Sequence, residues 1–159
     1  MNPIVSKSSR HSKITGDFSE HLILYWLSKH GFECARVDHV GLDLIARRPN
    51  STEVMGISVK ARSRNPGYEG SYLSVPNENY DKLQTACIAF RCKPYFAIVV
   101  DEANRIDAFI LSADHFLRIC PPGKKVSSWR MTEKSLAEYA SDPKIKCFRF
   151  NTGTLNWWT

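Results

Sequence analysis

Hydrophobic residues in the first part of the chain recur at helical spacing. Over 16–30, large apolar side chains occupy almost every side of a helix, which is typical of a helix buried on more than one face. Thr15 is a suitable N-cap, and Gly31 lies where a glycine commonly ends a helix. The pattern therefore predicts a first helix over 16–30.

Three runs rich in strand-forming residues follow this helix. They cover 32–37, 40–47 and 54–62, and the turn residues Pro49, Asn50 and Ser51 separate the last two runs. The next segment, 65–77, contains glycines and prolines. It is predicted to be a loop, where a substrate could be met.

The rest of the chain continues with helices and strands. Asn77 and Ser112 are suitable helix N-caps. We expect helices over 78–91, 112–117 and 132–139, strands over 95–100, 106–111 and 146–150, a hairpin turn at 101–104 and a loop over 121–130. The order helix, three strands, helix, strand predicts an α/β fold with helices on both faces of the sheet.

The chain divides into a short arm and one domain. Residues 1–13 are rich in Ser and Lys and poor in apolar residues, which predicts a loose basic arm. The remaining 14–159 shows no internal repeat and no convincing linker, so we expect one domain with a core at about 14–111 and C-terminal additions over 112–159.

Charge, cysteines and hydropathy narrow the class of protein. The net charge of +6 fits an anionic partner. The cysteines number five and form no CxxC pair, so we interpret them as structural thiols in a reducing compartment and not as a zinc site. No apolar run approaches the ~18 residues that span a bilayer. We therefore expect a cytoplasmic protein without a membrane partner.

Three charged side chains occupy positions that the pattern assigns to apolar surroundings. Glu20 shares its helix face with apolar residues, Asp43 lies inside VGLDLIA, and Lys60 lies inside ISVKA. Burying an unpaired charge is costly unless it is paired or binds a metal. If the three side chains converge on one cleft, they satisfy one another, and the carboxylates could hold a hard divalent cation.

Each of these residues has a plainer explanation when it is taken singly. Glu20 could reach solvent past its neighbours, and Asp43 could mark a strand end or bind local backbone groups. Lys60 could extend its amine from a strand edge. Three coincidences in neighbouring elements favour the shared site. Because side chains alternate along a strand, Ser58 and Lys60 lie on one face, and a hairpin would bring them to the same cleft as Asp43.

Three segments together resemble the signature stretches of PD-(D/E)XK nucleases. They are Gly16-Asp-Phe-Ser-Glu20, Gly41-Leu-Asp43-Leu-Ile-Ala and Ile57-Ser-Val-Lys60-Ala. The resemblance covers about 14–100 and is nearest to the archaeal Holliday-junction resolvase group. It implies a restriction-endonuclease-like αβββαβ core, in which helices flank both faces of a central mixed sheet.

The resemblance also implies roles for the matching residues. Asp43 would be the main ligand of Mg²⁺ or Mn²⁺, Glu20 would complete the metal site or hold the lysine, and the Val59 carbonyl would be a further ligand. Lys60 would position or help deprotonate the attacking water. The implied reaction is metal-assisted phosphodiester hydrolysis in DNA, including branched or damaged DNA, and many such nucleases act as homodimers.

Basic residues near these motifs are candidates for contacts to DNA. Arg47 and Arg48 follow the second strand, and Arg62 and Arg64 follow the lysine of the third. Tyr68 lies in the loop after Arg62 and Arg64 and adds an aromatic ring next to their positive charges. We expect these five residues to contact nucleic acid.

One position departs from the nuclease pattern. The family has Glu, Asp or Gln two residues before the lysine, and this chain has Ser58. The cation could be held by the remaining ligands and waters, or a carboxylate could have moved to Glu78 or Asp81. Alternatively, catalysis could be lost and nucleic-acid binding retained. The sequence thus leaves three functions open: an endonuclease, a non-catalytic nucleic-acid-binding module, and an interaction protein with a vestigial site.

Overall fold

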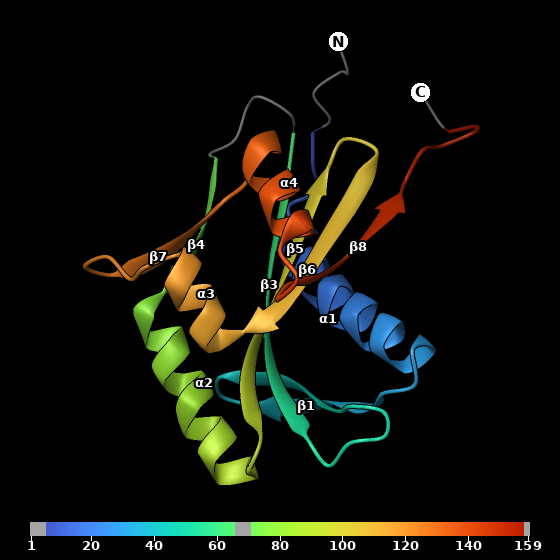
Figure 1. Cartoon of the computed structure of the whole chain (residues 1–159). Helices are drawn as coiled ribbons and strands as arrows, with labels where there is room; N and C mark the ends of the chain where they lie inside the picture. The colour runs from blue at the N-terminus through green and yellow to red at the C-terminus, as the bar shows by residue number, and fades with distance from the viewer. Residues whose placement is uncertain (1–5, 66–70, 158–159) are drawn as a thin grey trace.

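The computed structural model describes residues 6–65 and 71–157, and within them a six-stranded sheet lies at the centre (Figure 1). The sheet consists of β1 (Glu33–His39), β2 (Leu42–Arg47), β3 (Val54–Arg64), β5 (Lys93–Glu102), β6 (Arg105–Ser112) and β8 (Lys146–Asn151). The remaining elements are α1 (His11–Lys29), α2 (Asn77–Phe90), α3 (Ala113–Ile119), α4 (Glu133–Ser141), β4 (Tyr72–Pro76) and β7 (Val126–Arg130).

The sheet is mixed. Its strand order is β1-β2-β3-β5-β6-β8. Strands β3 and β5 are parallel, whereas the other neighbours are antiparallel. The connection between β3 and β5 contains β4 and α2. This arrangement confirms the prediction of an α/β core with the order αβββαβ, into which the short strand β4 is inserted.

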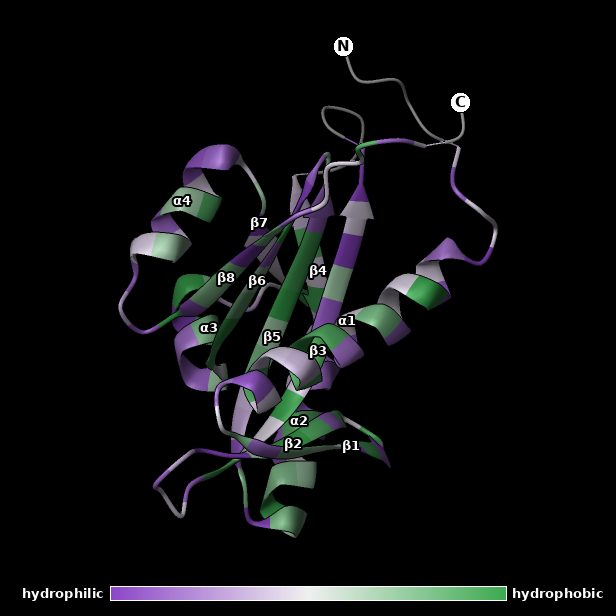
Figure 2. Ribbon diagram, turned by 90° about the vertical axis from the view of Figure 1, so that its right-hand side faces the viewer, coloured by the Kyte–Doolittle hydropathy of each residue, from purple (hydrophilic) through white to green (hydrophobic). Residues whose placement is uncertain are grey.

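Two apolar cores lie on opposite faces of the sheet. On one face, α1 contributes Leu22, Ile23 and Leu27 to a core shared with β2, β3, β5 and β6. On the other face, α2, α3, α4 and the β4–β7 pair form a second core around Trp129. Figure 1 shows α1 on one side of the sheet and α2 and α3 on the other. Hydrophobic colour fills the central strands β5 and β6 in Figure 2, because both faces of these strands are covered.

Helix α1 begins earlier than the sequence pattern predicts. It starts at His11, and its N-cap is Arg10, so the prediction of a start at residue 16 with a Thr15 cap is wrong. Thr15 is internal to the helix and its hydroxyl donates to the His11 carbonyl. The predicted end holds, because Gly31 has φ of 86° in the left-handed region that glycine favours. The division into an arm and one domain stays a prediction.

The β4–β7 pair corrects the two predicted loops over 65–77 and 121–130. Each strand has 5 residues, and they pair with each other from Tyr72↔Arg130 to Pro76↔Val126. Strands this short give a weak local signal, and their partners are distant in sequence. The Asn77 cap is also corrected, because Pro76 is the N-cap of α2. The Ser112 cap is confirmed, since its side chain accepts the His115 N–H. The sequence pattern predicts that Thr132 begins a helix, and it is the N-cap of α4, where its side chain accepts the Ser135 N–H.

The five cysteines are free thiols, and the reducing compartment stays a prediction. Burial raises the pKa of Cys120 to about 11. None of the helices in the described segments has the length and hydropathy needed to cross a bilayer. The cytoplasmic location stays a prediction.

Candidate active site

Asp43 lies where the pairing between β2 and β3 ends. The antiparallel ladder runs from Arg47↔Val54 to Leu44↔Ile57 and includes no pair for Asp43. The Val59 N–H, beyond the last pair, donates to Oδ2 of Asp43 at 2.7 Å. Since the N–H and C=O of one strand residue point to the same side, the Val59 carbonyl also points toward Asp43. An interrupted ladder thus creates room for a polar site at the edge of β3.

Two backbone features place Asp43 at this position. Gly41 has φ of 84°, and a Cβ there would lie 2.5 Å from the carbonyl carbon of Lys82 in α2. A glycine is therefore required for the close approach of this turn to the helix. Between Arg36 and His39, β1 has a register shift against β2. Bulges of this kind are frequent next to active sites, where they redirect side chains.

The Asp43 carboxyl is disfavoured in its charged form. Burial raises its pKa above the ordinary value, and the negative charge of Glu20 raises it further. The hydrogen bond from the Val59 N–H, the positive charge of Lys60 and a hydrogen bond from the Ser58 side chain all lower it. Glu20, Ser58 and Lys60 are therefore close enough to influence Asp43, and burial outweighs the groups that favour the carboxylate.

Lys60 shows the complementary effect. Burial lowers the pKa of its amine, the charge of Asp43 opposes this shift, and the charge of Lys82 adds to it. Lys60 is in register with Ile98 of β5, on the sheet face that α2 covers. The attraction between Asp43 and Lys60 thus only partly offsets the cost of burying both charges. An additional cation beside Asp43 would favour its ionised form.

Glu20 reaches the site from α1 but is already paired. Both Nε and a terminal nitrogen of Arg36 contact Oε2 of Glu20, at 3.1 and 2.7 Å. The Glu20 side chain is 23% exposed and that of Arg36 is 44% exposed, so solvent screens this ion pair. Both contacts use the same carboxylate oxygen. The other oxygen, Oε1, has no hydrogen bond to any residue within the described segments.

Ser58 occupies the position where the family has an acidic residue or Gln. It is 2% exposed, and its side chain hydrogen-bonds to Asp43. The two alternative carboxylates do not replace it. Glu78 is exposed and pairs with Lys82 in the next turn of α2 at 3.5 Å, and Asp81 is also exposed. The site therefore contains two acids, Asp43 and Glu20.

The oxygens of Asp43, Glu20 and Val59 are too few to hold a metal by themselves. They suit a magnesium ion that also binds waters and phosphate. Within 6–65 and 71–157, no group of three His, Cys, Asp or Glu side chains could hold a metal. Magnesium, however, prefers oxygen ligands and commonly binds through one or two carboxylates, keeping several waters and taking substrate phosphates. Asp43, Glu20 and the Val59 carbonyl match that donor set.

The two arginines at the end of β2 lie away from this site. Arg47 is in register with Val54 at the far end of the β2–β3 ladder, four residues and about 13 Å along the strand from Asp43. Arg48 approaches Glu53 at 3.8 Å in the adjoining turn. Any contact that these residues make with nucleic acid would therefore be separate from a contact at Asp43.

The arginines at the end of β3 are closer and differ from each other. Arg62 is exposed. Arg64 pairs with Glu102 at 2.7 Å and also donates to the Met131 carbonyl, so it has a structural role. Tyr68 lies outside the described residues. Nucleic-acid binding by these side chains stays a prediction.

The segment before α1 and the first residue of α1 supply a further basic surface at the end of β3. The amine of Lys7 donates to the Ser63 carbonyl at 2.8 Å, and His11 Nε2 lies 2.9 Å from the Ser63 hydroxyl. With Arg62, these residues border a hollow of about 370 Å³. This surface brings 6–10 and the end of β3 together.

Sequence reasoning missed three residues of the site. Arg36 forms an ion pair with Glu20. The charge of Lys82 lowers the pKa of Lys60, and Gly41 permits the turn before Asp43. Arg36 and Lys82 are exposed polar residues, and periodicity does not distinguish them from other surface residues. The glycine belongs to a quoted motif, but its reason is a contact with α2 that local sequence does not encode.

Comparisons with known proteins give a structural likeness without a sequence match. No protein-family model and no curated protein matches the chain. Among solved structures, it is similar to Hjc of Archaeoglobus fulgidus, a Holliday junction resolvase from an archaeal hyperthermophile, with a TM-score of 0.56 and 20% identity over 77% of this chain and 88% of that chain. With its mixed sheet and flanking helices, the chain thus has the restriction-endonuclease-like fold that its motifs predicted.

Proposed function

We propose that the protein is a metal-dependent endonuclease that hydrolyses phosphodiester bonds in DNA. The observation that carries this proposal is the half-buried Asp43 carboxylate, which is bound by the Val59 N–H and lies within the electrostatic reach of Lys60 and Glu20. Perturbed acid and amine groups in one site are typical of catalytic centres. The similarity to a Holliday junction resolvase supports the same reaction class.

Asp43, Glu20 and the Val59 carbonyl would hold Mg²⁺ or Mn²⁺. When bound, the cation would lower the pKa of a coordinated water and neutralise charge on the phosphate. The Val59 N–H keeps the Asp43 carboxylate oriented, because its hydrogen bond fixes Oδ2. Arg36 holds one oxygen of Glu20 in the same way.

Lys60 would orient the attacking water and stabilise negative charge that develops on the phosphate. Its lowered pKa makes the neutral amine more accessible than that of an exposed lysine, so it can also accept a proton. Ser58 hydrogen-bonds Asp43 and adds no charge. The site would therefore act with one acid fewer than the family pattern has.

The DNA backbone would run past the end of β3. Lys7, His11 and Arg62 border a hollow at the end of β3, and the chain has a net charge of +6. Phosphate contacts of this kind give salt-dependent affinity. Branched and damaged DNA are included in the proposed substrates, and assembly as a homodimer is part of the proposal.

The test is cleavage of branched, duplex and single-stranded DNA in Mg²⁺ or Mn²⁺. We expect the wild type to cut at least one substrate and Asp43→Ala to lose about a hundredfold or more of that activity, as is usual when a group that stabilises the transition state is removed. The control, Glu138→Ala, removes an exposed carboxylate on α4 and should keep full activity. An inactive wild type, or equal activity of Asp43→Ala, contradicts the proposal.

A second function is favoured by Ser58. A buried hydroxyl in place of a carboxylate suits a module that binds nucleic acid without cutting it. That function predicts salt-dependent DNA binding by the wild type with no cleavage in either cation. Cleavage that requires Asp43 excludes it.

A further inference from the structure

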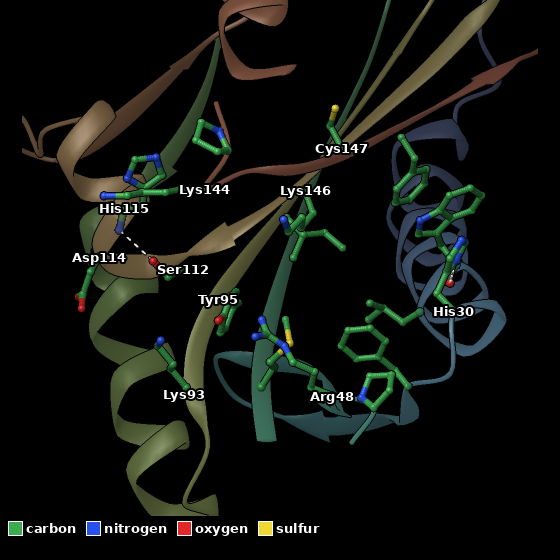
Figure 3. Close-up of a pocket in the computed structure, with 18 of the residues that line it drawn as sticks. His30, Arg48, Lys93, Tyr95, Ser112, Asp114, His115, Lys144, Lys146 and Cys147 are labelled. Carbon is green, nitrogen blue, oxygen red and sulfur yellow. Dashed lines mark hydrogen bonds between the residues drawn. The ribbon is translucent and has the colours of Figure 1, made fainter. Parts of the chain in front are cut away.

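A second cleft lies on the α1 face of the sheet at the opposite end of β3. Its volume is about 790 Å³, within the range of small-molecule sites. The walls come from α1, the turn after β2, the start of β5, α3 and the start of β8. In Figure 3, Arg48, Lys93, Lys144 and Lys146 from different segments border the same space.

This cleft is separate from the candidate active site. On β3 its lining residue is Met55, which is in register with Lys93 of β5. Lys60 lies five residues further along β3, about 16 Å away in an extended strand. The cleft also opens on the sheet face that α1 covers, whereas Lys60 lies on the face that α2 covers.

Positive charge dominates the lining. Five residues carry permanent positive charge and one carboxylate faces them: Arg48, Lys93, Arg118, Lys144, Lys146 and Asp114. Two nearby acids contact lining residues: Glu53 accepts from the Tyr95 hydroxyl at 3.2 Å and lies 3.8 Å from Arg48, and Asp142 contacts His115 Nε2 at 2.7 Å. Among these described residues, the remaining four cations form no ion pair with either acid. Lys93 and Lys146 are exposed and belong to neighbouring walls. The cleft therefore attracts an anion.

Aromatic rings form the other part of the lining. Trp26 stacks on Phe148 with ring centroids 4.3 Å apart, and Phe32 and Tyr95 also line the cleft. The Lys93 amine lies 5.8 Å from the centre of the Tyr95 ring. Flat apolar rings next to cations complement a ligand that combines a planar ring with negative charge.

We propose that this cleft binds nucleotide units, with a base against the aromatic wall and phosphate at Lys93, Lys146 and Arg48. An acidic peptide would use the cations but has no need for the aromatic wall, so the observations favour a nucleotide. The unit can belong to a single-stranded nucleic acid or be a free nucleotide. The inference does not require nuclease activity, because it concerns binding at a separate place.

The test measures binding of a fluorescein-labelled thymidine oligonucleotide of about 12 nucleotides by anisotropy. All proteins carry Asp43→Asn, so cleavage cannot interfere. Lys93→Glu/Lys146→Glu should weaken binding roughly tenfold or more, because two phosphate contacts are lost. The matched control, Lys124→Glu/Lys134→Glu, makes the same charge change at exposed lysines outside the cleft and should weaken binding less than about threefold.

Competition by thymidine monophosphate would assign the site to a free nucleotide, and retained oligonucleotide binding without competition would assign it to a strand. Equal weakening by both double variants, or no binding before the lysines are changed, overturns the proposal.

A second readout avoids any effect on folding: photocrosslinking with 5-iodouracil should label Trp26 or Tyr95. Crosslinks confined to the surface around Lys60 also overturn it. A negative result leaves cleavage by the wild type, and so the proposed nuclease function, unaffected.

Discussion

The two ends of β3 offer different chemistry on the same strand. In its C-terminal half, the charges of Lys60 and Glu20 both act on Asp43, and burial shifts the pKa of both Asp43 and Lys60 toward their neutral forms. At its start, Met55 borders a wide cleft with exposed cations and aromatic rings. Mixed charges that are partly buried suit proton and metal chemistry, whereas exposed charges of one sign suit binding.

This difference follows from what each end leaves unpaired. At the site end, the ladder between β2 and β3 stops at Leu44, and Asp43, which precedes it, accepts the Val59 N–H instead. At the cleft end, β2 and β3 are paired up to the turn, and the cleft forms between α1, β5 and β8. The end of the β2–β3 ladder therefore creates a small polar site, whereas the separation of α1, β5 and β8 creates a large open cleft.

The largest expected effect comes from replacing one lysine at each end of β3, since one change should affect cleavage and the other binding. Lys60→Met should slow single-turnover cleavage by about 10²–10⁴-fold, because general acid–base catalysis contributes that much. DNA binding, measured by anisotropy, should change little. Lys93→Met should weaken binding of single-stranded DNA and leave the cleavage rate at saturation unchanged. Reduced binding without slower cleavage in Lys60→Met would erase the distinction between the two ends.

Restoring an acid at position 58 should have an intermediate effect, on stability and metal dependence. Ser58 is buried, so without a cation Ser58→Glu should destabilise the protein by about 3 kcal/mol and lower Tm by roughly 6–12 °C. Mn²⁺ at about 100 times Kd should return up to about 2.7 kcal/mol. Calorimetry with and without chelator measures both changes. Ser74→Glu, on the exposed side of β4, is the control and should show neither change.

A Ser58→Glu protein that is destabilised to the same extent with and without Mn²⁺ would argue against a cation beside Asp43. It would leave the cleft at the other end unaffected.

The smallest expected effect is on the pH dependence of stability. The pKa of Asp43 is raised from 3.8 in the folded state, so the folded state binds this proton more tightly than the unfolded state does. The stability that protonation provides is present below about 3.8 and is lost as pH rises through the raised pKa. Asp43→Asn should therefore have a higher Tm than the wild type at pH 7 and a smaller difference in acid.

Thermal unfolding from pH 3 to 8 checks this expectation. Asp17→Asn, which changes a surface carboxylate paired with Lys13 in the next turn, should show no comparable gain at pH 7. If Asp43→Asn is less stable than the wild type at pH 7, the carboxylate is stabilised by its partners and the electrostatic picture of the site is reversed.

Local sequence predicted the elements that have strong patterns. The end of α1 at Gly31 and the Ser112 cap follow from residues that act within one turn. It failed at the start of α1 and at β4 and β7. The partner of each strand lies 50 or more positions away in sequence, as the pairing of Pro76 with Val126 shows, so no local pattern marks these strands.

For the candidate site, the sequence by itself determined which charges would need a partner. Glu20, Asp43 and Lys60 stood out because charges among apolar residues are costly to bury. Only the tertiary structure decided how that cost is met: β2 leaves β3 beside Val59, Gly41 packs on Lys82, and Arg36 neutralises Glu20. It alone also separated Arg48 from Arg62, because residues close in sequence lie at opposite ends of extended strands.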